Sequence, residues 1–273
     1  MSHRSYRKYK EDKEKKRKRI EALSGWRYAH RGLFSKPGIP ENSRAAFRRA
    51  ADNGYGAELD VHLLADGTLA VIHDSELRRM TGKEGIVENC TRGDLPHLFL
   101  GGTSETVPTF EEVLQIVGGR TPLIVELKTW NGNAAGLAGA VCKVLDDYEG
   151  LYCIESFDPR VLLWLRRRRP DVIRGILSQD FVGDRNGLSF LGAVNATHMT
   201  YSLLTRPDFI AYRFKDRKAL GNRFGLKVMK CKGASWTIRT PGQLRAAEAE
   251  GLWPIFEENS LGKNSLEDNN LNG

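Results

Sequence analysis

The stretch "TFEEVLQIVGGRTPLIVELK" (Thr109–Lys128) contains one predicted helix followed by one predicted strand. Thr109, with Glu112 three residues later, has the pattern of a capping box, which begins a helix. Two glycines close the apolar run, and glycine suits the left-handed conformation that often ends a helix. The run "PLIVELK" that follows is short and apolar, as expected of a strand in a sheet. The stretch therefore predicts one helix–strand unit of an α/β protein.

The same alternation continues on both sides of this unit. Further strand-like runs cover residues 27–32, 56–61, 69–74, 152–157, 172–177, 208–214, 233–239 and 253–258. Further helix-like runs cover residues 43–54, 136–150, 159–170 and 240–251. Repeated alternation of strands and helices is typical of a parallel sheet that has its helices on the outside.

Over 273 residues, a closed (β/α)₈ barrel of the TIM type fits this pattern best, and a doubly wound open sheet is the alternative. We expect a single, distorted α/β barrel over residues 26–258. The strand count is nine, one more than the barrel needs. The turn "ADGT" joins two strands with no helix between them, so we expect the irregularity there.

The net charge of +8 comes almost entirely from the N-terminus. Residues 1–19 hold ten basic and three acidic side chains, whereas the rest of the chain holds 32 basic and 31 acidic ones. We expect residues 1–25 to be a basic tail, helical or disordered, and residues 259–273 to be a disordered polar tail. Residues 1–19 are a solvated extension or a peripheral contact with an anionic membrane, and nucleic acid is not an expected partner.

Neither a signal peptide nor a membrane-spanning run is recognisable, so we expect a cytoplasmic protein. The four cysteines are far apart and form no metal-binding or disulfide pattern. We expect them to be buried free thiols.

Ionisable side chains recur where the predicted strands end. These positions are His30 and Arg31, Glu58 and Asp60, His73 and Asp74, Glu126 and Lys128, and Glu155, with Trp236 at a late strand end. Both α/β architectures place their chemistry at the carboxyl ends of parallel strands. The sequence therefore predicts one polar site at that end of the fold.

Three of these residues are suited to a metal. Glu58 and Asp60 are two apart on a strand and point to the same face, and Glu126 adds a third carboxylate from another strand. Three carboxylates without a thiolate favour a hard cation, Mg²⁺ or Ca²⁺. Two histidines beside a metal suit acid–base catalysis of phosphoryl chemistry, and Arg31 can bind phosphate oxygens.

Two other features have a plainer interpretation. His62 lies two residues beyond Asp60, but we expect it to be a polar residue at the rim, past the end of the strand. The run Arg166–Arg169 resembles a phosphate-binding patch, but cations in a last helical turn usually complement the helix dipole.

Taken together, "AHRG", "PENS", "ELDV", "DGTLAVIHD", "ELK", "SFDP" and "WTIRTPGQL" resemble, in this order, the glycerophosphodiester phosphodiesterase family. The resemblance covers about Tyr28 to Glu257. It implies a distorted (β/α)₈ barrel and metal-dependent hydrolysis of glycerophosphodiesters, which are small molecules, to an alcohol and glycerol 3-phosphate.

The resemblance also implies roles for single residues. His30 and His73 resemble the acid–base pair, and Glu58, Asp60 and Glu126 resemble the metal ligands. Arg31 resembles the phosphate clamp, and Lys128 and Trp236 resemble substrate-pocket residues. Glu41 matches an acidic residue of the family's loop, and its role stays open.

This chain departs from the family in two places. The segment after "VIHD" is of moderate length, so any lid is expected to be small. The late strand reads "LWPIFEEN" where the family commonly has "DGIITDYP", which bears on the shape of the pocket. Two other functions stay open: lysophospholipase D-like hydrolysis of a lipid, and a non-catalytic barrel whose basic tail binds a membrane or nucleic acid.

Overall fold

Eight parallel strands close into a barrel in the computed structural model of the chain, which describes residues 3–184 and 187–261. The strands are β1 (Tyr28–Ala29), β2 (Gly56–Leu63), β3 (Leu69–Val71), β4 (Leu123–Leu127), β5 (Tyr152–Ser156), β6 (Arg174–Ser178), β7 (Phe209–Arg213), β8 (Lys232–Ile238) and β9 (Trp253–Phe256). The α-helices are α1 (His3–Leu23), α2 (Arg44–Asp52), α3 (Arg78–Thr81), α4 (Phe110–Val117), α5 (Ala134–Leu145), α6 (Pro159–Arg168), α7 (Phe190–His198), α8 (Ser202–Thr205), α9 (Leu220–Lys227) and α10 (Pro241–Ala249). Short 3₁₀ helices cover Val87–Asn89, Leu95–His97, Phe214–Asp216 and Glu258–Ser260.

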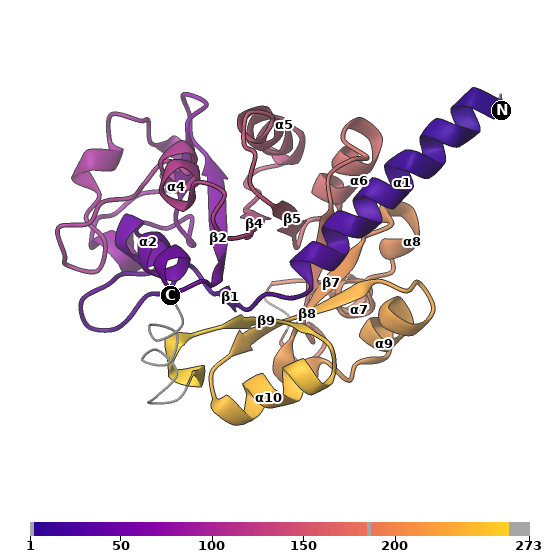
Figure 1. Ribbon diagram of the computed structural model, residues 1–273. Helices are drawn as coiled ribbons and strands as arrows, with labels where there is room; N and C mark the ends of the chain where they lie inside the picture. The colour runs from indigo at the N-terminus through magenta and orange to yellow at the C-terminus, as the bar shows by residue number, and fades with distance from the viewer. Residues whose placement is uncertain (1–2, 185–186, 262–273) are drawn as a thin grey trace.

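The barrel closes because β1 pairs in parallel with both β2 and β9. The strand order around it is β1-β9-β8-β7-β6-β5-β4-β2, and helices cover its outside (Figure 1). The expected (β/α)₈ barrel is confirmed, and the alternative of an open doubly wound sheet is wrong. The barrel is irregular at two strands: β1 has two residues, and the pairing of β8 with β9 shifts register between Ser235 and Ile238.

The ninth strand, β3, lies outside the barrel. It pairs antiparallel with β2, and the turn between them is the "ADGT" segment that the sequence marks as irregular. β3 is therefore not one of the parallel strands, contrary to the expectation that His73 follows a strand of that kind. The hairpin still brings His73 to the site, because the backbone N–H of Ile72 donates to the Asp60 carbonyl over 3.1 Å.

The five helices expected from the sequence are present as α2, α4, α5, α6 and α10. Thr109 and Glu112 form the predicted capping box at the start of α4, and Gly118 ends that helix with a left-handed φ of 57°. The last turn of α6 contains Arg166, Arg167 and Arg168, as the dipole interpretation predicts. Helices α7, α8 and α9 were not expected from the sequence.

Helix α1 closes the amino-terminal end of the barrel. Leu23 is fully buried there, in a cluster with interior residues such as Tyr28, Ile124 and Trp253. Lys16 on the same helix forms an ion pair with Asp208 over 2.8 Å. The first half of α1 extends away from the barrel (Figure 1).

The barrel interior changes from apolar to polar along each strand. Alternate residues of a strand point to the same face, and the lower inward positions hold apolar side chains such as Tyr28, Ile124 and Ile255. Two residues further along the same strands come His30, Glu126 and Glu257. The barrel interior is therefore apolar toward the amino-terminal ends of the strands and polar toward their carboxyl ends.

None of the described helices is both long enough and apolar enough to cross a membrane. The expected disordered tail, residues 259–273, falls almost entirely outside the described residues, which end at Leu261. All four cysteines are free thiols; Cys142, Cys153 and Cys231 are buried as expected, whereas Cys90 is only partly buried.

Candidate active site

A cavity of about 250 Å³ opens at the carboxyl ends of the barrel strands. His30, Arg31, Glu58, His73, Glu126 and Trp236 all line it, so six of the eight predicted site residues meet there. The remaining two, Asp60 and Lys128, contact this group directly, since Lys128 Nζ lies 2.9 Å from Glu126 Oε1 and 3.5 Å from Asp60 Oδ1. A polar cavity of about 440 Å³ adjoins it and shares His30 and Arg31.

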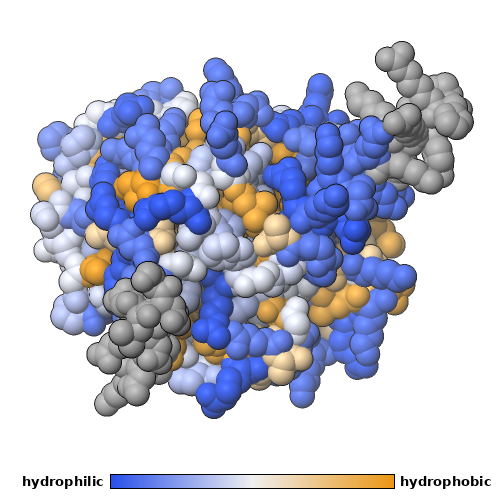
Figure 2. All heavy atoms as spheres, viewed as in Figure 1, coloured by the Kyte–Doolittle hydropathy of each residue, from blue (hydrophilic) through white to orange (hydrophobic). Residues whose placement is uncertain are grey.

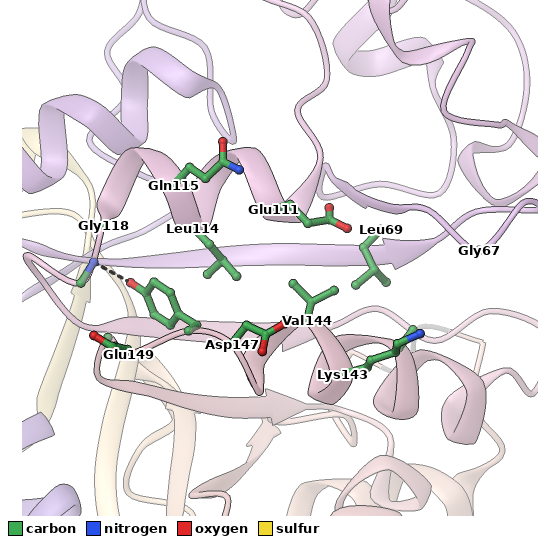
Figure 3. Close-up of a pocket in the computed structure, with 14 residues that line it drawn as sticks. Gly67, Leu69, Glu111, Leu114, Gln115, Gly118, Lys143, Val144, Asp147 and Glu149 are labelled. Carbon is green, nitrogen blue, oxygen red and sulfur yellow. Dashed lines mark hydrogen bonds between the residues drawn. The ribbon is translucent and has the colours of Figure 1, made fainter.

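A larger cavity lies elsewhere, between α4 and α5 on the outside of the barrel (Figure 3). Its volume is about 780 Å³, and its side chains include Leu114, Val144 and Tyr148, whose hydroxyl accepts a hydrogen bond from Gly119 N over 3.2 Å. It contains neither histidine nor a carboxylate of the predicted site. Cavity volume therefore does not identify the candidate active site in this molecule. The side chains that line the smaller cavity do.

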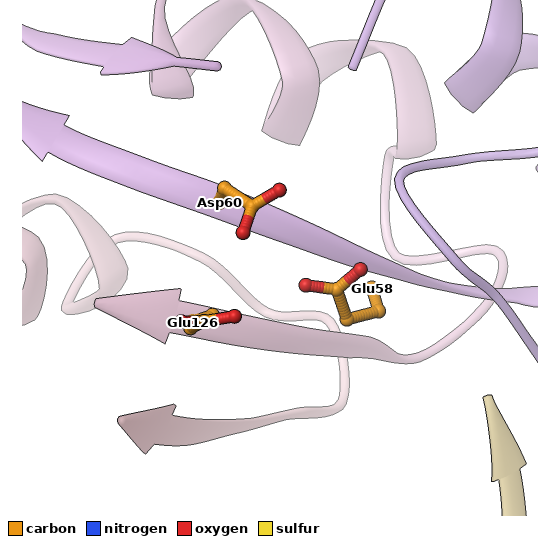
Figure 4. Close-up of side chains that lie close together, drawn as sticks. All are labelled: Glu58, Asp60 and Glu126. Carbon is orange, nitrogen blue, oxygen red and sulfur yellow. The ribbon is translucent and has the colours of Figure 1, made fainter. Parts of the chain in front are cut away.

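Glu58, Asp60 and Glu126 converge as the sequence predicts (Figure 4). Each offers an oxygen within 4.8 Å of the others, and all three side chains are buried. They converge because Asp60 and Glu126 are register partners in the β2–β4 ladder, while Glu58 is one inward position below Asp60. Three oxygen donors on rigid strands, without sulfur or nitrogen, fit a hard divalent cation.

The charge state of this cluster also fits a cation. Burial and the neighbouring carboxylates Asp60 and Glu126 raise the pKa of Glu58 well above its usual range. Burial likewise raises the pKa of Glu126, against the influence of Lys128. Burial alone would raise the pKa of Asp60 too, but Lys128, His73 and Arg31 hold it well below the usual range. Negative charge is thus only partly compensated, and a cation would stabilise the ionised form.

Each histidine of the cavity has a carboxylate next to its Nδ1 atom. His30 Nδ1 lies 3.5 Å from Glu257 Oε1, an ion-pair distance without hydrogen-bond geometry, and its Nε2 lies 4.0 Å from Glu58. His73 Nδ1 lies 2.5 Å from Asp74 Oδ1. Such carboxylates hold the ring orientation and leave Nε2 for other partners.

Burial favours the neutral form of both imidazoles. Burial lowers the pKa of His30, and Glu257 opposes that shift. Burial also lowers the pKa of His73 to about 4, with Lys128 and Arg31 acting in the same direction and Asp60 opposing them. A neutral imidazole can accept a proton, as a general base must.

Arg31 joins the site to the loop that follows β1. Its Nη1 donates to Glu41 over 2.6 Å, its Nε lies 3.6 Å from Asp60, and its backbone N–H donates to Glu58 over 2.9 Å. Glu41 also accepts a hydrogen bond from Arg79 over 2.7 Å. The loop acid Glu41 therefore fixes the direction of the Arg31 guanidinium.

Aromatic rings form one wall of the cavity. Trp236 donates from Nε1 to the Ala211 carbonyl over 3.1 Å, which fixes the indole ring. Phe157 packs edge-on against Trp236, with ring centroids 5.6 Å apart, and against Phe181, with centroids 6.1 Å apart. The wall thus leads from the carboxylate cluster toward the β6–α7 segment.

Two contributing residues were missed by the sequence analysis: Glu257, which lies beside His30, and Asn42, which donates to Asp60 over 2.8 Å. A third, Glu155, was placed at a strand end but given no role, and it is a buried carboxylate opposite Glu126. A signal existed for two of them. Glu155 and Glu257 each follow an inward apolar residue, Cys153 and Ile255, by two positions, as Glu126 follows Ile124.

The interpretation of His62 as a rim residue is wrong. His62 is buried within β2, its Nδ1 lies 2.6 Å from Glu88 Oε1, and its Nε2 lies 3.2 Å from the His73 carbonyl. The strand continues to Leu63 because β3 pairs with it there, so His62 is covered by the hairpin.

The sequence profile of the glycerophosphoryl diester phosphodiesterase family matches residues 30–197, more than half of the chain. A glycerophosphodiester phosphodiesterase of Bacillus altitudinis is 34% identical over 166 residues, which cover 57% of this chain and 67% of the relative. One from Caldanaerobacter subterraneus is 34% identical over 161 residues, covering 55% and 65%. The alignments thus span about two thirds of the length of these relatives.

Solved structures share the fold. A phosphodiesterase of Oleispira antarctica, solved in complex with the product sn-glycerol-3-phosphate, superposes with a TM-score of 0.73 at 21% identity. The superposition covers 89% of this chain and 96% of that one. A glycerophosphodiester phosphodiesterase of Parabacteroides distasonis gives a TM-score of 0.68 at 23% identity, covering 90% and 97%.

Proposed function

The chain belongs to the glycerophosphoryl diester phosphodiesterase family, and from this premise we propose that it hydrolyses glycerophosphodiesters to an alcohol and glycerol 3-phosphate, with His30 and His73 as the acid–base pair. The observation that carries the proposal is the meeting of both histidines with Glu58, Glu126 and Arg31 in one cavity. Each histidine has a carboxylate beside Nδ1, so its Nε2 is the atom that exchanges a proton with substrate.

Glu58, Asp60 and Glu126 would hold Mg²⁺ or Ca²⁺. When bound, such an ion would neutralise phosphate charge and orient the phosphodiester. Arg31, which follows β1, would bind phosphate oxygens, while Glu41 holds its guanidinium in place. Lys128 favours the ionised forms of Glu126 and Asp60, and Trp236 would pack against the substrate.

One imidazole would take a proton from the nucleophile and the other would give a proton to the leaving alcohol. The nucleophile is water or the 2-hydroxyl of the glycerol moiety, and the second route passes through a cyclic phosphate. Hydrolysis in ¹⁸O water and trapping of a cyclic product distinguish the two routes.

Purified protein with glycerophosphocholine tests the proposal. We expect a chelator to abolish turnover and added Mg²⁺ or Ca²⁺ to restore it. His30→Ala or His73→Ala should lower kcat by about 10²–10⁴-fold, as for loss of an acid–base group. Full turnover after exhaustive treatment with EDTA would contradict the metal requirement, and unchanged kcat in both variants would contradict the histidine roles.

A second candidate is hydrolysis of lysophospholipids, which the aromatic wall of Trp236, Phe157 and Phe181 favours. An acyl chain needs an apolar path out of a polar cavity, and these three rings, each in contact with the next, would line one. Phe157→Ala should lower kcat/KM for a lysophospholipid more than for glycerophosphocholine, in a panel compared with Mg²⁺, Ca²⁺ and Mn²⁺. An equal effect on both substrates would favour the water-soluble class.

The non-catalytic alternative has no observation in its favour, because none of the five predicted catalytic and metal-binding side chains is displaced from the site. The cytoplasmic location stays a prediction that cell fractionation can test.

A further inference from the structure

Three helices that the sequence did not predict lie together on one flank of the barrel. Helices α7, α8 and α9 surround a cavity of about 200 Å³ whose walls include His198, Leu203 and Phe224. Gly221 permits α7 and α9 to cross closely, since a Cβ at that position would lie 2.5 Å from the His198 Cα. The flank is therefore a closely packed surface that includes a small hollow.

This flank exposes more apolar surface than any other described part of the chain. Of the twelve exposed large apolar residues among residues 3–184 and 187–261, seven belong to these helices or directly follow them, and they are 47–72% exposed. We call them the apolar flank: Phe190, Leu191, Leu203, Leu204, Leu220, Phe224 and Val228. Single exposed apolar residues are ordinary, but a concentration of them marks an interaction surface.

Helix α9 shows how the exposed surface is arranged. Leu220, Phe224 and Val228 recur every four residues, so they form one exposed apolar stripe. Arg223 and Lys227 are also exposed and lie next to this stripe. An apolar stripe bordered by cations is typical of a helix that lies in the interface of an anionic membrane.

Residues 187–230 carry a positive net charge, although Arg217 pairs with Glu250 at the end of α10 over 2.8 Å and Arg213 lies 3.9 Å from Asp184. Residues 187–230 contain eight lysines and arginines but only two acidic residues, Asp208 and Asp216. Asp208 pairs with Lys16 of α1 over 2.8 Å, and Asp216 pairs with Arg213. Both acidic groups are thus neutralised, and the pair between Asp208 and Lys16 also attaches the basic helix α1 next to the flank.

Figure 2 shows hydrophobic residues beside hydrophilic ones in the region where Figure 1 places α8 and α9, next to α1. We propose that the apolar flank docks on an anionic membrane surface, with its leucine and phenylalanine side chains in the interface and its lysines and arginines against lipid phosphates. The inference goes beyond the proposed reaction and holds for either substrate class.

The charge and the apolar content together favour lipid over other partners. Nucleic acid would match the cations but would not need seven exposed aliphatic and aromatic side chains. A second copy of the chain would match the apolar residues but would bring two positive surfaces together. An anionic lipid surface satisfies both properties.

Co-sedimentation of the full chain with vesicles tests the proposal. We expect binding to vesicles of phosphatidylcholine mixed with phosphatidylglycerol, weaker binding at high salt, and little binding to phosphatidylcholine alone. Leu220→Ser with Val228→Ser should lower the affinity about tenfold or more. Arg223→Glu with Lys227→Glu should lower it by about tenfold or more.

Matched substitutions elsewhere on the surface serve as controls. Phe99→Ser removes an exposed aromatic residue far from the flank in the sequence, and Arg48→Glu with Lys143→Glu reverses two exposed charges on α2 and α5. These should leave vesicle binding close to wild type. Turnover of water-soluble glycerophosphocholine should be unchanged in the flank variants, so loss of docking is distinguishable from loss of the proposed activity.

A second measurement locates the contact directly. A Val228→Trp variant should show more fluorescence quenching by brominated lipids than the wild type does. The proposal is overturned if the full chain does not bind the mixed vesicles, or if only removal of residues 3–15 abolishes binding. It is also overturned if the flank substitutions instead dissociate a dimer or abolish binding of RNA while vesicle binding persists.

Discussion

Glu257 lies beside His30, with its Oε1 atom 3.5 Å from His30 Nδ1 and 3.0 Å from Arg239 Nη2. Burial alone would raise the pKa of Glu257, but His30 and Arg239 lower it to about 2, so it is an anion at neutral pH. An anion at this place raises the pKa of His30 against the effect of burial. Glu257 is therefore a positioning residue for the proposed acid–base chemistry.

Glu257→Gln should shift the pH–rate limb that belongs to His30 to lower pH, because the anion that favours the imidazolium is gone. We expect kcat/KM at neutral pH to fall about tenfold, as for loss of a group that orients a histidine. The neighbouring Glu258→Gln is the matched control, since Glu258 pairs with Arg49 of α2 instead. An unshifted pH–rate profile in Glu257→Gln would contradict the role of Glu257 as a positioning residue for His30.

Glu155 is a different case, because it is buried without a hydrogen-bond partner at Oε2. Burial and the Glu126 and Asp60 carboxylates raise its pKa well above the usual range, and Glu155 in turn contributes to the raised pKa of Glu58. The cavity thus contains one more carboxylate than the predicted three-ligand site requires.

In Glu155→Gln, we expect the metal-free protein to be more stable by about 1 kcal/mol at pH 8, because a buried acid without a partner is removed. The increase in melting temperature on addition of Mg²⁺ or Ca²⁺ should become smaller, because the cavity has lost negative charge. Thermal denaturation with and without the cation measures both effects. A metal-free variant less stable than wild type would show that Glu155 has a structural role instead.

Helix α1 is attached to the barrel by its last turns. Leu23 is buried among residues of the barrel interior, and the Tyr28 hydroxyl donates to the Leu23 carbonyl over 2.7 Å. Arg19 lies over the Tyr152 ring at 5.4 Å. The basic composition of residues 1–19 concealed this role, because charge runs usually indicate solvated segments.

Leu23→Ala should therefore lower the free energy of unfolding by about 2–4 kcal/mol, the usual cost of truncating a buried leucine. Lys15→Ala is the control on the exposed part of the same helix, and it should change stability by less than about 0.5 kcal/mol. Chemical denaturation of both variants is the measurement. Equal stability of the two would mean that α1 does not close the barrel in solution.

Helices and strands could be predicted where the sequence pattern that indicates them lies within the segment itself. The capping box at Thr109 and the apolar runs that end at Glu126 and Ser156 predict α4, β4 and β5 without knowledge of the rest of the fold. Helices α7 and α9 were missed because their exposed leucines and phenylalanines obscure the polar face on which helix periodicity depends. The extent of β2 was underestimated because its last residues depend on pairing with β3.

The whole barrel responds to pH through its buried acids. Glu58, Glu126 and Glu155 all have a raised pKa in the folded state. A carboxyl group of this kind favours folding when protonated, so its unfavourable contribution grows as the pH rises above the unfolded pKa of about 4.5. Without a cation, these carboxyl groups therefore lower the free energy of unfolding of the barrel at neutral and higher pH.

We expect the melting temperature of the metal-free protein to be higher near pH 5 than near pH 8. A Glu58→Gln variant measured at both pH values shows how much of this difference comes from the other titrating groups. Added Mg²⁺ or Ca²⁺ should raise the melting temperature more at pH 8 than at pH 5, because protons compete with the cation for the same oxygens. The variant should show a smaller response to both pH and cation. An equal cation effect at both pH values would argue against binding at these carboxylates.

By itself, the sequence determined the number and order of the strands, five of the ten α-helices among the described residues, and the eight residues that meet at the site. These follow from local periodicity and from the rule that chemistry lies at strand ends. Only the tertiary structure decided that β3 pairs antiparallel with β2 outside the barrel, that α1 closes its base, and that Glu257 lies beside His30. The physical reason is that strand pairing, burial and the partners of a charge are contacts between distant segments, which no single segment encodes.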